Sequence, residues 1–214
     1  MLTPQDITLL QQGQHPEPFA VLGMHQTPGG LCVRVFLPAV LCVELLAANS
    51  RDVAALPLAQ LQRQGDSDLF VWQGTERERF DYLLRVHRAG APGQGVQQEL
   101  IDDPYRFPLL LGQTDAWLLA EGRHQRPFEC LGAHPRRCLD VDGVAFAVWA
   151  PNARRVSVVG DFNHWDGRRH PMRLRRECGV WELFLPGLAA GALYKFELLT
   201  QQDELLLKAD PYGL

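Results

Sequence analysis

The chain carries two copies of one sequence pattern at a domain-sized spacing, and this repeat limits the folds that it can adopt. The segment Pro-Phe-Ala-Val-Leu-Gly-Met-His at residues 18–25 returns as Pro-Phe-Glu-Cys-Leu-Gly-Ala-His at residues 127–134. A strand-like run that ends in proline follows each copy, at 30–38 and 143–151, and each half closes on Asp-Pro-Tyr. Self-similarity at one fixed spacing indicates a duplicated domain, and differences between the copies indicate where function resides.

Alternating apolar residues fill much of both halves. The runs 31–37 and 144–149 place an apolar side chain at every second position, and turn residues separate such runs from the next. This period of two is typical of antiparallel β-sandwiches. Because Asp-Pro-Tyr ends each half, we place the boundary near residue 110 and predict two sandwich domains, 1–109 and 110–214.

A short helix is predicted at the start of the chain. Thr3 can cap a helix, Pro4 suits its first turn, and Asp6 favours the positive end of the helix dipole. The helix should run to about Gln12 and stop before Gly13, because glycine readily adopts the conformation that ends a helix.

The linker between the halves should carry a second helix, over residues 114–122. Its Trp117 and Leu118 are expected to pack against one or both sandwiches. Trp149 and Trp181 lie within strand-like runs, so we expect both indoles in a core.

Composition excludes several classes of protein. The net charge is −4 and neither half is a polycation, so nucleic acid binding is not indicated. No apolar run approaches the ~20 residues of a membrane span, and the first residues lack a secretion signal. Five cysteines without Cys-x-x-Cys spacing favour free thiols in a reducing cytoplasm. Five arginines at 168–176 form either a solvated face or a docking surface for an acidic partner.

The second half contains the residues that are suited to bind a ligand. A valine-rich strand leads into a short loop that presents Asn163, Trp165 and Asp166. In Tyr-Lys-Phe at 194–196 the two aromatics share one face of a strand, so Lys195 points to the other face. A sugar ring stacks on an indole, and its hydroxyls take hydrogen bonds from ammonium, amide and carboxylate groups. The alternative for Trp165 is burial in the sandwich or at a contact between domains.

Several of these motifs resemble one enzyme family. The similarity to the amino-terminal region of bacterial 1,4-α-glucan (glycogen) branching enzymes rests on Trp-Ala-Pro-Asn-Ala at 149–153, the stretch 156–168, His-Pro-Met at 170–172, Tyr-Lys-Phe, and Lys-Ala-Asp-Pro-Tyr at 208–212. The later half resembles a family 48 carbohydrate-binding module, and the earlier half resembles the extra amino-terminal sandwich of these enzymes. The resemblance implies an all-β fold of two tandem immunoglobulin-like antiparallel β-sandwiches, with a short N-terminal helix and a helical linker.

The resemblance also implies a glucan site. The glycogen-binding β subunit of AMP-activated protein kinase carries a similar module, in which a tryptophan and the lysine of Tyr-Lys-Phe contact glucan. These two positions map onto Trp165 and Lys195, and Asn163 and Asp166 complete the carbohydrate-binding set that we expect.

Two departures shape this expectation. A second sugar-stacking tryptophan of that β subunit is replaced here by Leu-Leu-Leu-Lys at 205–208, which predicts weak binding or another use of the surface. In the first repeat, Asp52 and Leu83 stand where the second repeat has Trp165 and Lys195. We therefore expect glucan contacts of this type in the second repeat only.

The resemblance implies a catalytic parent rather than catalysis by this chain. Branching enzymes are glycosyltransferases of the glycoside hydrolase family 13 type, which use two carboxylates on a (β/α)8 barrel of ~250 residues to make α-1,6 branches. We expect the barrel beyond this chain, and no catalytic residue, metal ion or cofactor within it. Three roles stay open: binding α-1,4-glucan or maltooligosaccharides for the parent, buttressing its barrel, and acting alone as a glycogen-targeting scaffold.

Overall fold

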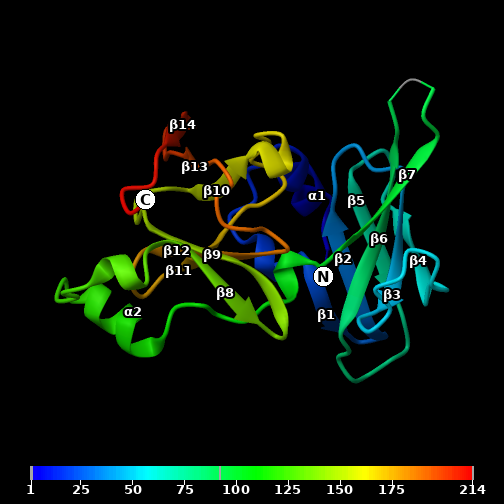
Figure 1. Cartoon of the computed structure of the whole chain (residues 1–214), viewed down its shortest axis with the longest axis horizontal. Helices are drawn as coiled ribbons and strands as arrows, with labels where there is room; N and C mark the ends of the chain where they lie inside the picture. The colour runs from blue at the N-terminus through cyan, green and yellow to red at the C-terminus, as the bar shows by residue number, and fades with distance from the viewer. Residues whose placement is uncertain (1, 92, 214) are drawn as a thin grey trace. The chain divides into compact units, whose positions relative to one another are not determined.

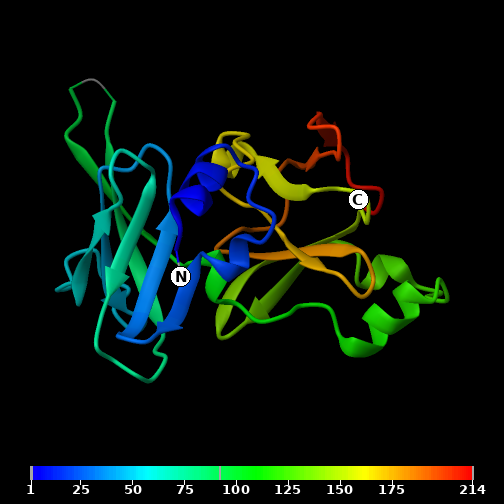
Figure 2. The same cartoon turned by 180° about the vertical axis from the view of Figure 1, so that it is seen from behind.

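The computed structural model describes residues 2–91 and 93–213, which form two compact units. Unit 1 contains the residues up to Gln11 together with Phe19–Arg106, and unit 2 contains Gln12–Pro18 together with the chain from Phe107 onward. Both units consist mostly of antiparallel β-strands (Figure 1 and Figure 2). The predicted all-β class is confirmed, while the domain limits 1–109 and 110–214 remain a proposal.

Unit 1 contains seven strands in the order β1-β2-β5-β4-β3-β6-β7. Strand β4 pairs with β5 at one end and with β3 at the other, so it joins the two layers of the sandwich. The elements of this part of the chain are α1 (Pro4–Gln11), η1 (Pro18–Ala20), β1 (Gly23–Thr27), β2 (Gly30–Phe36), β3 (Cys42–Ala47), β4 (Ala59–Arg63), β5 (Leu69–Gln73), β6 (Tyr82–Ala89), β7 (Val96–Ile101) and η2 (Pro104–Arg106).

Unit 2 contains two antiparallel sheets, with the strand orders β10-β13-β14 and β11-β12-β9-β8. In both views the linker and its helix lie along the second sheet, on the side away from the first (Figure 1 and Figure 2). The elements are α2 (Gln113–Ala120), η3 (Pro127–Glu129), β8 (Gly132–Cys138), β9 (Val141–Trp149), β10 (Arg155–Gly160), η4 (Asp161–Asn163), β11 (Arg173–Arg175), β12 (Val180–Pro186), β13 (Tyr194–Leu199) and β14 (Leu205–Lys208).

The N-terminal helix forms as predicted. Thr3 Oγ1 accepts a hydrogen bond from the Asp6 N–H at 3.2 Å, and Asp6 Oδ2 accepts one from the Thr3 N–H at 2.8 Å. This reciprocal pair is a capping box, which satisfies two backbone donors at the start of the helix. Gly13 has a φ of +63° just beyond the helix end, a left-handed conformation that costs glycine little.

A tyrosine and an aspartate close each repeat in the same way. In unit 1 the Tyr82 hydroxyl donates to Asp103 Oδ2 at 2.5 Å, and in unit 2 the Tyr194 hydroxyl donates to Asp210 Oδ2. In both units the second oxygen of the aspartate accepts the N–H of the tyrosine two residues later. The recurrence of Asp-Pro-Tyr therefore reflects a shared contact that ties the end of each repeat to its β6 or β13 strand.

The tyrosine of each Asp-Pro-Tyr packs against a glycine at the start of the same repeat. Gly23 has a φ of +90° and Gly132 a φ of +105°, and a Cβ added there would lie 3.0 Å from Tyr105 O or 3.1 Å from Tyr212 Cβ. Two residues after each glycine, a histidine ring nitrogen forms a hydrogen bond with the carbonyl of the leucine that precedes the glycine. The distance is 2.9 Å from His25 to Leu22 and 3.0 Å from His134 to Leu131. These contacts explain the conserved spacing within the repeated Leu-Gly-x-His, because every member has a structural partner.

Strand β9 is buried on both faces along most of its length. Phe146 lies on β9 and Trp181 lies on the neighbouring strand β12, and each is 1% exposed. This burial confirms Trp181 as a core residue. On the opposite face, Ala145 packs with Phe107, and Ala147 packs with α2. The small side chains on that face leave room for the linker to lie directly on the sheet.

A buried glutamate fixes the linker to this sheet. Glu182 of β12 is fully buried, and its carboxylate accepts the backbone N–H groups of Leu110 and Leu111 at 3.2 and 2.8 Å. Arg173 and Arg175 pair with the same carboxylate at 3.0 and 3.5 Å. Because a buried charge is costly unless it is paired, these contacts account for the position of Glu182 inside the unit.

The linker helix forms, but its packing differs from the prediction. Ala116 and Leu119 contact the sheet, whereas Trp117 is 55% exposed and Leu118 is half-buried outside that cluster. Residues three apart share one face of a helix, so the face that carries Ala116 and Leu119 turns Trp117 outward. The prediction that Trp117 packs against a sandwich is wrong.

Candidate functional site

The candidate loop follows a strand that is buried at every position. β10 ends at Gly160, η4 forms one short turn, and the chain then reverses through His164 and Trp165 (Figure 2). Both residues have a φ near +60°, at 58° and 59°. Two successive left-handed residues are costly without glycine, so the surrounding contacts must hold this turn in place.

Asn163 supplies those contacts. Its Oδ1 accepts the Gly160 N–H at 3.0 Å, and its Nδ2 donates to the Val158 carbonyl at 2.8 Å and lies 2.9 Å from His170 Nδ1. The Asn163 side chain is 1% exposed. Its amide therefore positions the loop from inside the unit and does not face solvent.

Trp165 stands at the solvent side of this loop. Its backbone N–H donates to the Gly160 carbonyl at 2.9 Å, and its indole N–H donates to Asp161 Oδ1 at 2.8 Å. These bonds fix the ring, while 39% of the residue remains exposed. The indole is thus neither buried in its own sandwich nor free to rotate.

Lys195 lies on the neighbouring strand at the same end of β10. It pairs with Val159, and Tyr194 pairs with Gly160, to which Trp165 is bonded. Phe196 is 1% exposed, so the aromatic face of β13 is the core face and Lys195 is exposed on the other, as predicted. Within residues 2–91 and 93–213, no acceptor lies in hydrogen-bond range of its ammonium group. Backbone register therefore places Lys195 beside the end of β10 from which the Trp165 loop departs.

Asp166 is engaged by its own loop. Its carboxylate takes two hydrogen bonds from the Arg168 guanidinium, at 2.9 and 2.7 Å, and a third from the Arg168 N–H. Burial would raise the pKa of Asp166, but these hydrogen bonds and the charges of Arg168 and Arg169 outweigh it and lower the pKa. Asp166 therefore stays ionised and braces the turn beneath Trp165.

The arginine-rich stretch is not an unpaired basic surface. Each of its five arginines forms an ion pair, Arg168 and Arg169 with Asp166, Arg173 with Glu182, Arg175 with Glu177 and Glu182, and Arg176 with Glu17. The arginines are therefore neutralised within the unit, and Arg169, Arg173 and Arg175 are largely covered, so this stretch forms neither a solvated basic face nor a free docking surface for an acidic partner.

A buried ion pair lies under the loop. Arg155 pairs with Glu197, and its guanidinium also donates to Ser157 Oγ at 2.9 Å and to the Gly167 carbonyl at 2.8 Å. A Cβ added to Gly167 would lie within 1.9 Å of the Glu197 carboxylate. The absence of a side chain at Gly167 therefore lets the loop pack directly on the ion pair, and the Arg155 hydrogen bond to its carbonyl holds the loop there.

Unit 1 has a related ion pair but lacks the candidate contacts. Arg85 bonds Glu44 at 2.6 Å and also bonds the carbonyls of Val53 and Ala55 in the loop that corresponds to the Trp165 loop. Leu83, at the position of Lys195, is 1% exposed. Asp52 and Leu83, which stand at the positions of Trp165 and Lys195, supply neither an indole nor an ammonium group.

The edge strand β14 is apolar and exposed. Leu205, Leu206 and Leu207 are 62%, 36% and 56% exposed. Glu197 pairs with Leu207 and Leu199 with Leu205, so these two leucines share the face of Lys195. The surface that presents the cation is therefore bordered by aliphatic side chains where an aromatic ring could have stacked on a sugar.

Trp149 is also exposed, so the sequence prediction that places it in a core is wrong. It is the last residue of β9 and belongs to the Ala145–Ala147 face, which the linker covers. The helix α2 ends before it reaches Trp149, so 60% of this residue is exposed. A strand-like run in the sequence does not reveal where the linker stops covering the face that carries Trp149.

A cysteine and a histidine approach each other beside α2, but they lack the geometry of a catalytic nucleophile and its base. His124 Nε2 lies 3.7 Å from Cys130 Sγ and 3.2 Å from Asp115 Oδ1, so one ring nitrogen serves both neighbours. Burial, and then the charge of Asp115, raise the pKa of the Cys130 thiol to about 11. Within the described residues, no three His, Cys, Asp or Glu side chains gather closely enough to hold a metal ion.

None of the helices in residues 2–91 and 93–213 has the length and apolar character that a membrane crossing requires.

Comparison with known families gives the class of each half. Residues 130–213 match carbohydrate-binding module 48, the isoamylase N-terminal domain, and residues 3–105 match the N-terminal domain of the alpha-1,4-glucan branching enzyme GlgB. The first match defines unit 2 as a carbohydrate-binding type of β-sandwich. The two matches in this order show that the chain belongs to the amino-terminal regions of glucan branching enzymes, as the motifs implied.

Solved structures of similar fold include pullulanases. The pullulanase of Anoxybacillus sp. LM18-11 is 13% identical over 89% of this chain, with a TM-score of 0.32, and PulA of Klebsiella pneumoniae is 17% identical over 90%, also with a TM-score of 0.32. The chain spans 26% and 20% of those two proteins. Likenesses of this size carry no argument about function.

Proposed function

We propose that this chain binds α-1,4-glucan on the Trp165–Lys195 surface of unit 2 and positions it for a branching transferase of which the chain is the amino-terminal part. The observation that carries the proposal is a fixed, exposed indole at the same end of β10 as an ammonium group that has no partner among the described residues. An indole face and hydrogen-bond donors suit the faces and hydroxyls of glucose units.

In this proposal the four predicted residues have two kinds of role. Trp165 and Lys195 contact the sugar, while Asn163 and Asp166 are positioning residues that hold the loop through their own hydrogen bonds. Asp161 joins the site because its carboxylate accepts the indole N–H of Trp165 and so fixes the ring. The parent would act in the cytoplasm on glycogen, with its catalytic barrel as the second partner.

Isothermal titration of maltoheptaose into the whole chain tests the proposal. Trp165→Ala should weaken binding about tenfold and Lys195→Ala about threefold, since the first loses a stacking surface and the second a few hydrogen bonds. Trp117→Ala is the matched control, because it removes another exposed indole, from α2. Binding that survives Trp165→Ala unchanged would remove this site.

A second function is favoured by β14. Its exposed leucines form an apolar edge that is suited to pack against another domain, which agrees with a structural role as a buttress of the catalytic barrel. This role alone predicts no measurable affinity of the chain for maltoheptaose. It also predicts that Leu205→Ser with Leu207→Ser lowers the stability of the parent enzyme without changing that of this chain.

A further inference from the structure

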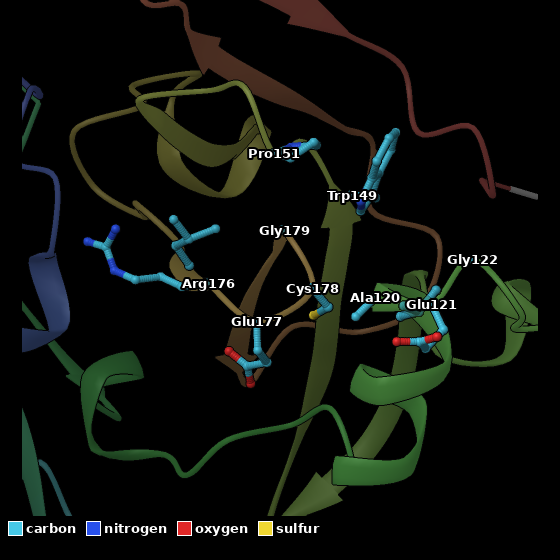
Figure 3. Close-up of a pocket in the computed structure, with 11 residues that line it drawn as sticks. Ala120, Glu121, Gly122, Trp149, Pro151, Arg176, Glu177, Cys178 and Gly179 are labelled. Atoms are coloured by element: carbon cyan, nitrogen blue, oxygen red, sulfur yellow. The ribbon is translucent and has the colours of Figure 1, made fainter.

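The exposed indole of Trp149 borders a groove that the Trp165 site does not use. The groove has a volume of about 600 Å³. Its walls are the end of α2 at Leu119–Gly122, Trp149 with Pro151, and the turn at 174–179 (Figure 3). In Figure 3 the indole projects from the end of β9, Glu121 comes from the end of α2, and Gly179 lies in the turn between β11 and β12.

The groove offers both a donor and an acceptor without partners. Among the described residues, no acceptor lies in hydrogen-bond range of the Trp149 indole N–H, and no donor bonds the Glu121 carboxylate. A Cβ at Gly179 would approach Pro151 to 2.8 Å and the Trp149 nitrogen to 3.4 Å. Glycine therefore keeps the space beside the indole open, and a bound molecule could satisfy both groups at once.

The charges in the groove limit the class of ligand. Glu177 and Arg176 also line the groove, but they form ion pairs with Arg175 and Glu17, so Glu121 is left as the carboxylate without an ion-pair partner among the described residues. An unpaired carboxylate disfavours phosphates and other anions. An apolar protein surface would bury the Glu121 charge without a partner, which is costly. A neutral molecule rich in hydroxyls avoids both penalties, because it can stack on the ring and donate to the carboxylate.

We propose that this groove is a second α-glucan site, separate from the Trp165–Lys195 surface; the choice of ligand rests on the function proposed above. The two sites lie at opposite ends of β10, since Trp149 precedes its first residue and Trp165 follows its last. Six strand residues separate those ends by roughly 17 Å. One unit could then hold two strands of a branched polymer, or two stretches of one chain.

Nuclear magnetic resonance of the intact chain tests this proposal. The five indole N–H signals are assigned with single-tryptophan variants and followed while maltoheptaose is added. The Trp149 signal should shift on titration and should still shift in Trp165→Ala, whereas the Trp117 signal should not. Glu121→Gln, which changes no core residue, should weaken the response of Trp149 by about three- to tenfold while the Trp165 signal titrates as before.

The outcomes separate the two proposals. A Trp149 signal that stays fixed while the Trp165 signal moves overturns the second site and leaves the first. Movement of Trp149 alone overturns the proposed function at Trp165 and supports the groove. If neither signal moves at millimolar sugar, both proposals fall. Equal movement in wild type and Glu121→Gln shows that the carboxylate is not a contact, which also contradicts the groove as described.

Discussion

Asn163 shows how one buried amide can govern an exposed contact. It links the end of β10 to the turn that carries Trp165, and it uses both ends of its side chain to do so. Sequence reasoning selected Asn163 for its chemistry but placed it among the residues that present themselves to a sugar. A sequence pattern reports the type of residue, while the direction of a side chain in an irregular loop depends on tertiary contacts.

Replacement of Asn163 by alanine should therefore affect stability first. The change leaves the Gly160 N–H and the Val158 carbonyl buried without their side-chain partner, which should lower the free energy of unfolding by about 2–3 kcal/mol. Glucan affinity should fall with it as the turn loosens. Urea denaturation measures the first effect, and Asn152→Ala on an exposed turn is the control. Equal stability of the two variants contradicts the positioning role.

The neighbouring His170 predicts a pH dependence. Burial lowers the pKa of its imidazole to about 4, from an ordinary value of 6.5. As the pH falls from about 6.5 to about 4, the unfolded chain takes up a proton that the folded chain refuses, so His170 contributes less stability. The full loss is about 3 kcal/mol.

Asp103 also changes the stability in this pH range, because burial raises the pKa of its carboxyl to about 6. The folded chain then takes up this proton before the unfolded chain does, so Asp103 contributes more stability as the pH falls. The comparison of wild type with His170→Gln cancels that contribution. The stability advantage of wild type should shrink as the pH drops from 6.5 to 4. An advantage that stays constant across this window, by urea denaturation at each pH, excludes a buried neutral His170.

At the scale of elements, the closing contact of each repeat predicts a costly glycine substitution. Gly132→Ala places a Cβ at a φ of +105° and 3.1 Å from Tyr212 Cβ. Gly187→Ala is the control, since its φ of +73° is also left-handed but nothing lies within 4 Å of the added atom. Both variants should lose about 1 kcal/mol from backbone conformation, and Gly132→Ala should lose about 1–2 kcal/mol more. Similar losses in urea denaturation would show that the tyrosine does not pack tightly there.

Most elements of the fold follow from local signals. The capping box of α1, the alternation of β2 and β9, and the core face of β13 all depend on neighbours in sequence. Trp149 and Trp117 were misplaced because their burial depends on where one element stops covering another. That limit is set by the length and path of the linker, which neither alternation nor helical period reveals.

At the scale of the whole molecule, two sites on one unit predict a preference for polymer. A glycogen particle can occupy both sites, and the second contact then gains from a high effective concentration. Trp149→Ala should lower the affinity for glycogen by at least tenfold and that for maltotriose by twofold or less. Affinity electrophoresis of wild type and Trp149→Ala, in gels with glycogen, with maltotriose and with neither, measures both affinities. Equal losses for both ligands would mean that the sites act independently.

The buried ion pairs under the two long loops have a consequence for biosynthesis. Glu44 faces Arg85 in the first copy, while the second copy has Ser157 facing Glu197, with Arg155 beside them. If strands from the two copies exchanged places while the chain emerged from the ribosome, Glu44 would meet Glu197 and Arg85 would meet Arg155. Such a hybrid sandwich would bury like charges. We therefore expect the reversed polarity to disfavour the exchange of strands between the two copies during folding.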